Sequence, residues 1–186
     1  MQHIRHWSSI LVFLLTLCGC VPSQPPVAAT APANILVAVV LSPVDRPEVI
    51  EGSPAFESTL HADLQARGLE IITPPPLQEP FSTRRETMDR LLYLVALAPT
   101  ELVLLVEAEA RYFSQIEGRY RWTVQGTVIL EEQGPSARHA EFSFSVPVFL
   151  QFHHEREAAA LQAAAPVLER RIRSLLDDYL EGRPTP

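Results

Sequence analysis

Lysine is absent from this sequence, and all of its 15 basic residues are arginine. A lysine Schiff base and a P-loop lysine are therefore excluded, together with the enzyme classes that depend on them. Positive charge is also scarce, because the formal net charge is -7 and the sequence pI is near 5.3. Since such a chain repels phosphate backbones, we expect no nucleic-acid partner.

Cysteine is nearly as rare, with only Cys18 and Cys20 among 186 residues. This number excludes a small fold held together by several disulfides. The length itself suits one domain, or one domain with a tail. The two cysteines instead draw attention to the N-terminus, where both of them lie.

The N-terminus combines Arg5 with an apolar stretch over residues 8–17. About ten apolar residues are too few to cross a bilayer of about 30 Å as a helix, but they suit the central region of a signal peptide. Leu17, Cys18, Gly19 and Cys20 follow. This tetrapeptide resembles the lipobox of bacterial lipoproteins, which has a small residue before the cut and an acceptor cysteine after it.

The resemblance implies cleavage after Gly19 and a lipid on Cys20. Two or more acyl chains anchor a protein stably, whereas one gives marginal binding. The lipidated Cys20 would then have no free thiol, so neither disulfide nor thiol chemistry is expected. Val21 in place of aspartate favours, by the family's sorting rule, the outer membrane with the domain facing the periplasm.

Four segments follow from this interpretation. Residues 1–19 are the signal peptide, and residues 20–33 are the lipidated cysteine with a Pro/Ala-rich tether. Residues 34–182 form one periplasmic domain, and residues 183–186 are a tail.

The first half of the domain predicts a βαβ unit. Residues 34–41 form a continuous apolar run, which is typical of a strand buried on both faces. A helix of about fourteen residues starts at Ser53-Pro54 and stops at Gly68, and a short strand covers 69–73. Thr83 and Glu86 fit a capping box for a second helix. Its expected apolar stripe is Met88, Leu91, Leu92 and Val95.

The second half alternates between apolar and polar residues over 101–112, 120–130 and 140–146. This period of two predicts an antiparallel meander with one wet face. From about residue 155, an apolar stripe from Ala158 to Tyr179 predicts a helix that packs on the sheet, with a kink or restart at Pro166. The fold class is therefore α+β, in the order β-α-β-α-β-β-β-α with a mixed sheet.

This order resembles a group of periplasmic lipoproteins. The group includes the LpoB-type activators of penicillin-binding proteins, the curli secretion lipoprotein and the amino-terminal domain of TolB. The strand at 34–41, the helix and strand at 56–72 and the strand at 101–109 carry the resemblance. It implies a domain that binds or regulates another envelope protein. Auxiliary lipoproteins of envelope ABC transporters offer an alternative, because they also combine an anchor with a small α+β domain.

No motif of catalysis stands out. His153 and His154 are adjacent and lack a metal-binding spacing, so no metal and no cofactor is expected. Glu107 and Glu109 share a strand face as a catalytic pair could, but neighbouring arginines favour charge pairing. Ser143 and Ser145 lie outside any nucleophile motif, and the arginine clusters on the helices suit a solvated face.

The sequence therefore predicts a non-enzymatic, lipid-anchored envelope protein. The wet face of the meander is the expected surface for its protein partner. Its charged residues are Glu107, Glu109, Arg111, Arg119 and Arg121.

Overall fold

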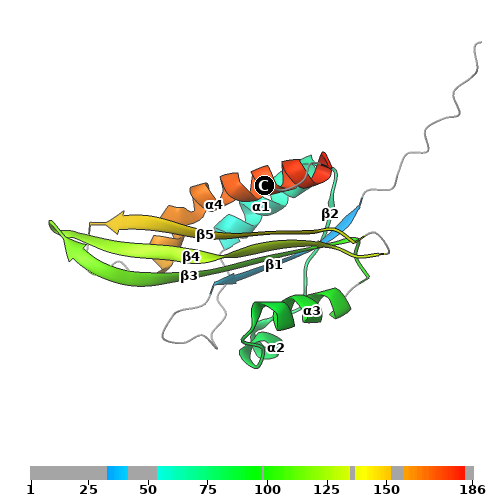
Figure 1. Ribbon diagram of the computed structural model, residues 1–186, viewed down its shortest axis with the longest axis horizontal. Coiled ribbons are helices and arrows are strands. Elements are labelled where there is room, and N and C mark those ends of the chain that lie inside the picture. The colour runs from blue at the N-terminus through cyan, green and yellow to red at the C-terminus, as the bar shows by residue number, and fades with distance from the viewer. Residues whose placement is uncertain (1–32, 42–53, 98, 135–136, 152–156, 183–186) are drawn as a thin grey trace, which may run out of the picture. The chain divides into compact units, whose positions relative to one another are not determined.

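The computed structural model describes residues 33–41, 54–97, 99–134, 137–151 and 157–182. Within them the chain forms a five-stranded mixed sheet in the order β2-β1-β3-β4-β5. Helices α1 and α4 cover one face of the sheet, and α2 and α3 lie on the opposite face (Figure 1). The elements are β1 (Asn34–Leu41), α1 (Pro54–Ala66), β2 (Glu70–Ile72), α2 (Gln78–Ser82), α3 (Thr87–Leu97), β3 (Leu102–Ile116), β4 (Arg119–Glu132), β5 (His139–Leu150) and α4 (Glu157–Leu180).

Strand β1 lies inside the sheet, parallel to both of its neighbours, β2 and β3. Its alternating residues enter two cores, because Ile35 faces α1 and α4 whereas Leu36 faces α2 and α3. Burial on both faces explains the uninterrupted apolar run and confirms the predicted central strand. The α+β class and the predicted order of the main elements are confirmed as well.

The βαβ unit follows its sequence signals closely. Helix α1 buries Phe56, Leu60 and Leu64, which recur every four residues. Gly68 ends the turn after the helix with φ of +78°. Only glycine adopts this conformation without strain, so the chain can reverse into β2 there.

The segment before β3 differs from the prediction in two ways. A short helix, α2, lies between the short strand and the predicted second helix, where no element was predicted, and it buries Phe81. Helix α3 begins at Thr87, whereas Thr83 caps the end of α2, so the predicted capping box is wrong.

The predicted apolar stripe of α3 is also wrong in part. Leu91 is buried as expected, but Met88 and Leu92 are 51% and 61% exposed. Arg90 and Leu94 face the sheet instead. The apolar stripe was assigned from residue type alone, and it missed a buried arginine that has an anionic partner on the sheet.

Strands β3 and β4 form a long hairpin that continues beyond β1. The last pair between β1 and β3 is Leu41 with Ala108, whereas β3 pairs with β4 as far as Ile116 with Arg119. The register shifts between Tyr112 and Ser114. An extra residue at such a bulge increases the local twist of the hairpin.

Helix α4 packs on the same face as α1, over β3, β4 and β5. It runs as one helix through Pro166, which is exposed, so the predicted restart does not occur. Ala158 is exposed and Ala160 buried, so the buried stripe begins two residues later than predicted.

The end of α4 is fixed to the sheet by polar contacts. The hydroxyl of Tyr179 donates to Glu132 Oε2 at 2.7 Å, and Arg138 Nε donates to the same oxygen at 2.9 Å. Arg138 also stacks 4.1 Å from the Tyr179 ring centroid. Burial and the bond to Glu132 raise the pKa of the Tyr179 phenol far above its usual range, while the bonds from Arg138 and Tyr179 lower the pKa of Glu132.

Candidate functional site

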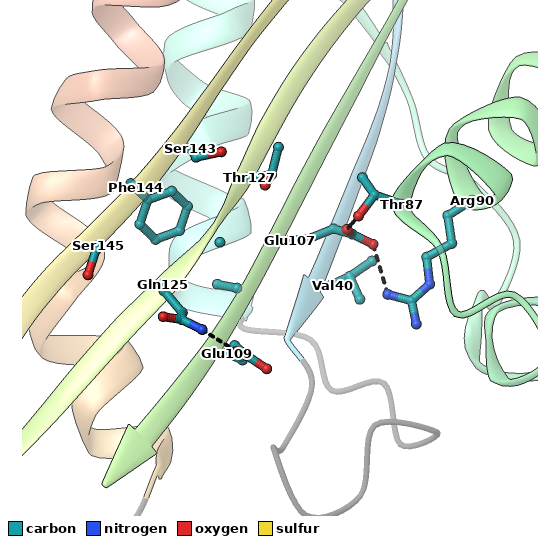
Figure 2. Close-up of a pocket in the computed structure, with 12 residues that line it drawn as sticks. Val40, Thr87, Arg90, Glu107, Glu109, Gln125, Thr127, Ser143, Phe144 and Ser145 are labelled. Carbon is teal, nitrogen blue, oxygen red and sulfur yellow. Dashed lines mark hydrogen bonds and ion pairs between the residues drawn. The ribbon is translucent and has the colours of Figure 1, made fainter. Parts of the chain in front are cut away.

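A polar groove runs along the sheet face beside α3, with a volume of about 400 Å³ (Figure 2). It forms because α2 and α3 cover only part of this face, leaving the polar residues of β3, β4 and β5 open. Side chains that reach it include charged, amide and hydroxyl groups. They are Thr87, Arg90, Glu107, Glu109, Gln125, Thr127, Ser143 and Ser145.

Glu107 is held by two donors from α3, as the dashed lines in Figure 2 mark. Arg90 Nη1 donates to Glu107 Oε1 at 2.8 Å, and Thr87 Oγ1 donates to Glu107 Oε2 at 2.5 Å. The side chains of Arg90 and Glu107 are only 8% and 14% exposed. Both carboxylate oxygens are therefore engaged in fixing α3 to the sheet.

Arg90 is positioned by α2 and by the segment between α2 and α3. Its Nε donates to the carbonyl oxygen of Arg84 at 2.7 Å, and its guanidinium lies 5.4 Å from the Phe81 ring centroid. A buried arginine needs such partners, since an uncompensated charge in the interior is costly. The burial of Arg90 was not predicted from the sequence, because its partners come from three different segments.

Glu109 is held by a second set of donors within the sheet. Gln125 Nε2 donates to Glu109 Oε1 at 2.6 Å, and Arg111 Nε donates to the same oxygen at 2.8 Å. Gln125 is the direct cross-strand neighbour of Glu109. The charge pairing expected between Glu109 and Arg111 is thus confirmed.

The chemistry that the groove can offer is hydrogen bonding. Its two carboxylates already accept hydrogen bonds from cationic or amide donors, whereas Ser143 and Ser145 are exposed hydroxyls on β5. Among the described residues, no group of three or more His, Cys, Asp or Glu side chains could hold a metal ion. His153 and His154 lie outside the described residues, and so do Gly19 and Cys20.

The five residues of the predicted partner surface separate into two places. Glu107 and Glu109 line the groove, and the Glu107 side chain is only 14% exposed. Arg111, which pairs with Glu109, lies farther along β3. Arg119 and Arg121 lie near the far end of the β3–β4 hairpin. We call this second region the hairpin tip, made of Arg111, Tyr112, Phe113, Arg119, Tyr120, Arg121, Trp122 and, from β5, Phe149.

Aromatic side chains dominate the hairpin tip. Tyr112, Phe113 and Phe149 are 53%, 65% and 52% exposed. Tyr112 contacts the rings of Tyr120 and Trp122, with centroid distances of 6.4 and 5.6 Å. The guanidinium of Arg121 lies 4.6 Å from the Phe113 ring centroid. An arginine stacked on an exposed aromatic ring presents charge and apolar area together.

A two-residue turn closes the hairpin. Glu117 and Gly118 both have positive φ, at 51° and 77°. This is the arrangement of a type I′ turn, whose twist suits a tight β-hairpin.

Sequence reasoning found the arginines of the hairpin tip but not its exposed aromatic residues. Neither Tyr112 nor Phe113 was predicted to be exposed. The adjacent aromatic residues break the alternation of β3, which was the available signal for a bulge.

No family model matches this chain, and no curated protein matches its sequence. Similar solved structures include bacterial lipoproteins. Lipoprotein GNA1162 from Neisseria meningitidis is 16% identical, with 76% of this chain and 99% of that chain covered and a TM-score of 0.42. Rare lipoprotein B from Shewanella oneidensis is 11% identical, with 77% and 91% covered and a TM-score of 0.31.

Proposed function

We propose that this protein is a lipid-anchored, periplasm-facing envelope lipoprotein whose domain binds or regulates another envelope protein without catalysing a reaction. The observation that carries the proposal is the sequence Leu17-Cys18-Gly19-Cys20 behind a short apolar stretch and ahead of a Pro/Ala-rich segment. In this order, the apolar stretch would serve as an export signal, the cysteine as an anchor and the Pro/Ala-rich segment as a spacer.

The anchor has a direct test with a matched control in the chain itself. Cys20→Ala should abolish incorporation of labelled palmitate, whereas Cys18→Ala should leave it intact, because only Cys20 follows a small residue. Equal labelling of both variants would refute the anchor. No helix in the described part of the chain has the length and apolar character needed to span a bilayer.

Sorting to the outer membrane is tested at the next residue. Val21→Asp should move the protein from the outer-membrane to the inner-membrane fraction, because aspartate after the lipidated cysteine is the retention residue of the sorting rule. Val21→Asn gives a variant of similar size without the charge. An unchanged distribution of Val21→Asp would remove the argument for the outer membrane.

The non-catalytic role is supported by the contacts of the two candidate carboxylates. Glu107 accepts hydrogen bonds from Arg90 and Thr87, and Glu109 accepts them from Arg111 and Gln125. Carboxylates held in this way connect elements of the fold. A hydrolytic activity that disappeared in Glu109→Gln while the protein stayed folded would contradict the proposal.

A further inference from the structure

We infer that the hairpin tip is the partner-binding surface, and that it recognises an acidic protein segment carrying apolar side chains. This inference rests on the proposed function and names the chemistry of the partner. Two observations lead to it: the charge at the tip and its exposed aromatic area.

The charge at the hairpin tip is opposite to that of the chain as a whole. The chain has a formal net charge of -7. Over residues 109–123, however, Arg111 is paired with Glu109, and the remaining charged residues Glu117, Arg119 and Arg121 give a formal charge of +1. Complementary charge steers partners together and suppresses wrong ones, so a basic end on an acidic protein selects an acidic partner.

The aromatic residues add exposed apolar area to the charge of the hairpin tip. Tyr, Trp and Arg are the residues most enriched where binding energy concentrates at protein interfaces. Tyr112, Phe113 and Phe149 are each more than half exposed. Arg121 is paired with Phe149 and stacks on Phe113, so these residues share one face of the hairpin, whereas Tyr112 is paired with Trp122 on the other face. A partner with apolar side chains between its acidic residues would cover the Phe113 and Phe149 rings while its carboxylates met Arg119 and Arg121.

A photo-crosslinker at the tip tests the inference in cells. The full-length lipoprotein would carry benzoylphenylalanine at Phe113, and the crosslinked partner segment would be sequenced by mass spectrometry. We expect a segment of net negative charge with interspersed apolar residues. The same crosslinker at Leu180, which is 45% exposed at the end of α4, should not yield that adduct.

Charge reversal supplies the matched control. Arg119→Glu with Arg121→Glu should reduce the adduct at least tenfold. Arg170→Glu with Arg171→Glu makes the same charge change on exposed residues of α4 and should leave it unchanged. An adduct with a neutral or basic segment, with lipid or with a second copy of this chain would overturn the inference, and so would an equal loss in both double variants.

The tip also contains its own spectroscopic reporter. The two tryptophans are Trp7 and Trp122, so cleavage after Gly19 leaves Trp122 alone. In the mature lipoprotein held in phosphatidylcholine nanodiscs, a synthetic peptide alternating glutamate and leucine should shift the Trp122 emission. Its affinity should fall at least tenfold with Arg119→Glu and Arg121→Glu. A shift of the emission with phosphatidylglycerol vesicles but not with the peptide would count against a protein partner. The absence of a shift with either probe would count against it as well.

Palmitate labelling of the same strains separates this inference from the proposed function. Normal labelling of Cys20 without an adduct at Phe113 would reject the tip as the binding surface and leave the anchor standing. Loss of labelling would reject the anchor, whatever the crosslinking result.

Discussion

Arg90 on α3 and Glu107 on β3 form an ion pair of 2.8 Å in which both side chains are largely shielded from water. The pair joins a helix to a sheet face that is otherwise polar at this point. Its partners are 17 residues apart along the chain, so it forms only when α3 has packed.

Replacing one member of this ion pair should lower the free energy of unfolding markedly. Glu107→Gln leaves the Arg90 charge without an anion, and breaking a mostly buried pair costs about 3 kcal/mol. Urea unfolding of the variant should show this loss in the free energy of unfolding. Glu109→Gln is the matched control, because its partner Arg111 is 56% exposed, and it should cost less than about 1 kcal/mol. Equal costs for both would contradict the assigned role of Arg90.

Gly126 should tolerate no side chain. A Cβ built there would lie 1.9 Å from the carbonyl oxygen of Glu107 on the neighbouring strand, and backbone cannot move aside without disturbing the sheet. We expect Gly126→Ala to lower the free energy of unfolding by about 2 kcal/mol or more, as overpacked sites do. Ser145→Ala on β5 is exposed and should change the melting temperature little. A melting temperature for Gly126→Ala within one degree of the wild type would refute the close approach.

A substitution in the turn at the end of the hairpin should stabilise the fold. Glu117 has φ of 51°, and asparagine tolerates this conformation better than glutamate. Glu117→Asn should therefore raise the free energy of unfolding by roughly 0.5 kcal/mol. Glu117→Gln removes the same charge but keeps the unfavourable conformation. If both variants gain equally, charge and not backbone strain is the cause.

His139 should make the stability depend on pH. Its Nδ1 lies 2.6 Å from Glu131, and this bond, with a second contact to Glu141, raises the pKa of His139 above 6.5. A raised pKa in the folded state stabilises the fold fully below pH 6.5, and the contribution is lost as the pH rises through the folded-state value. Since the side chain is 45% exposed, the effect is only about 0.5 kcal/mol. Unfolding measured from pH 5 to 9 should show this slope in wild type and His61→Gln, but not in His139→Gln.

The periodicity of apolar residues predicted those elements whose buried faces pack only against other apolar residues. Strand β1 is apolar throughout because both of its faces are buried, and Phe56, Leu60 and Leu64 recur because α1 buries one face. Gly68 marked a helix end that only a positive φ could form. In each case the decisive interaction is local or uniform along the segment.

The features that were missed depend on long-range partners. Arg90 is buried because Glu107 approaches from the sheet, and no pattern within α3 indicates that carboxylate. The predicted partner surface was treated as one patch because its residues alternate along β3 and β4. The limited cover of α2 and α3, and the bulge after Tyr112, divide it into a groove and a tip.

Strand β5 has consequences for how this protein behaves at high concentration. Among the described strands it has a neighbour on one side only, β4, and Pro147 is the ninth of its 12 residues. Proline has no N–H and within sheets is confined to edges, where its nitrogen side faces solvent. A strand from another molecule would find a donor missing in the second half of β5. The outer edge is thereby blunted against edge-to-edge aggregation, which would suit a protein concentrated on a membrane surface by the proposed lipid anchor.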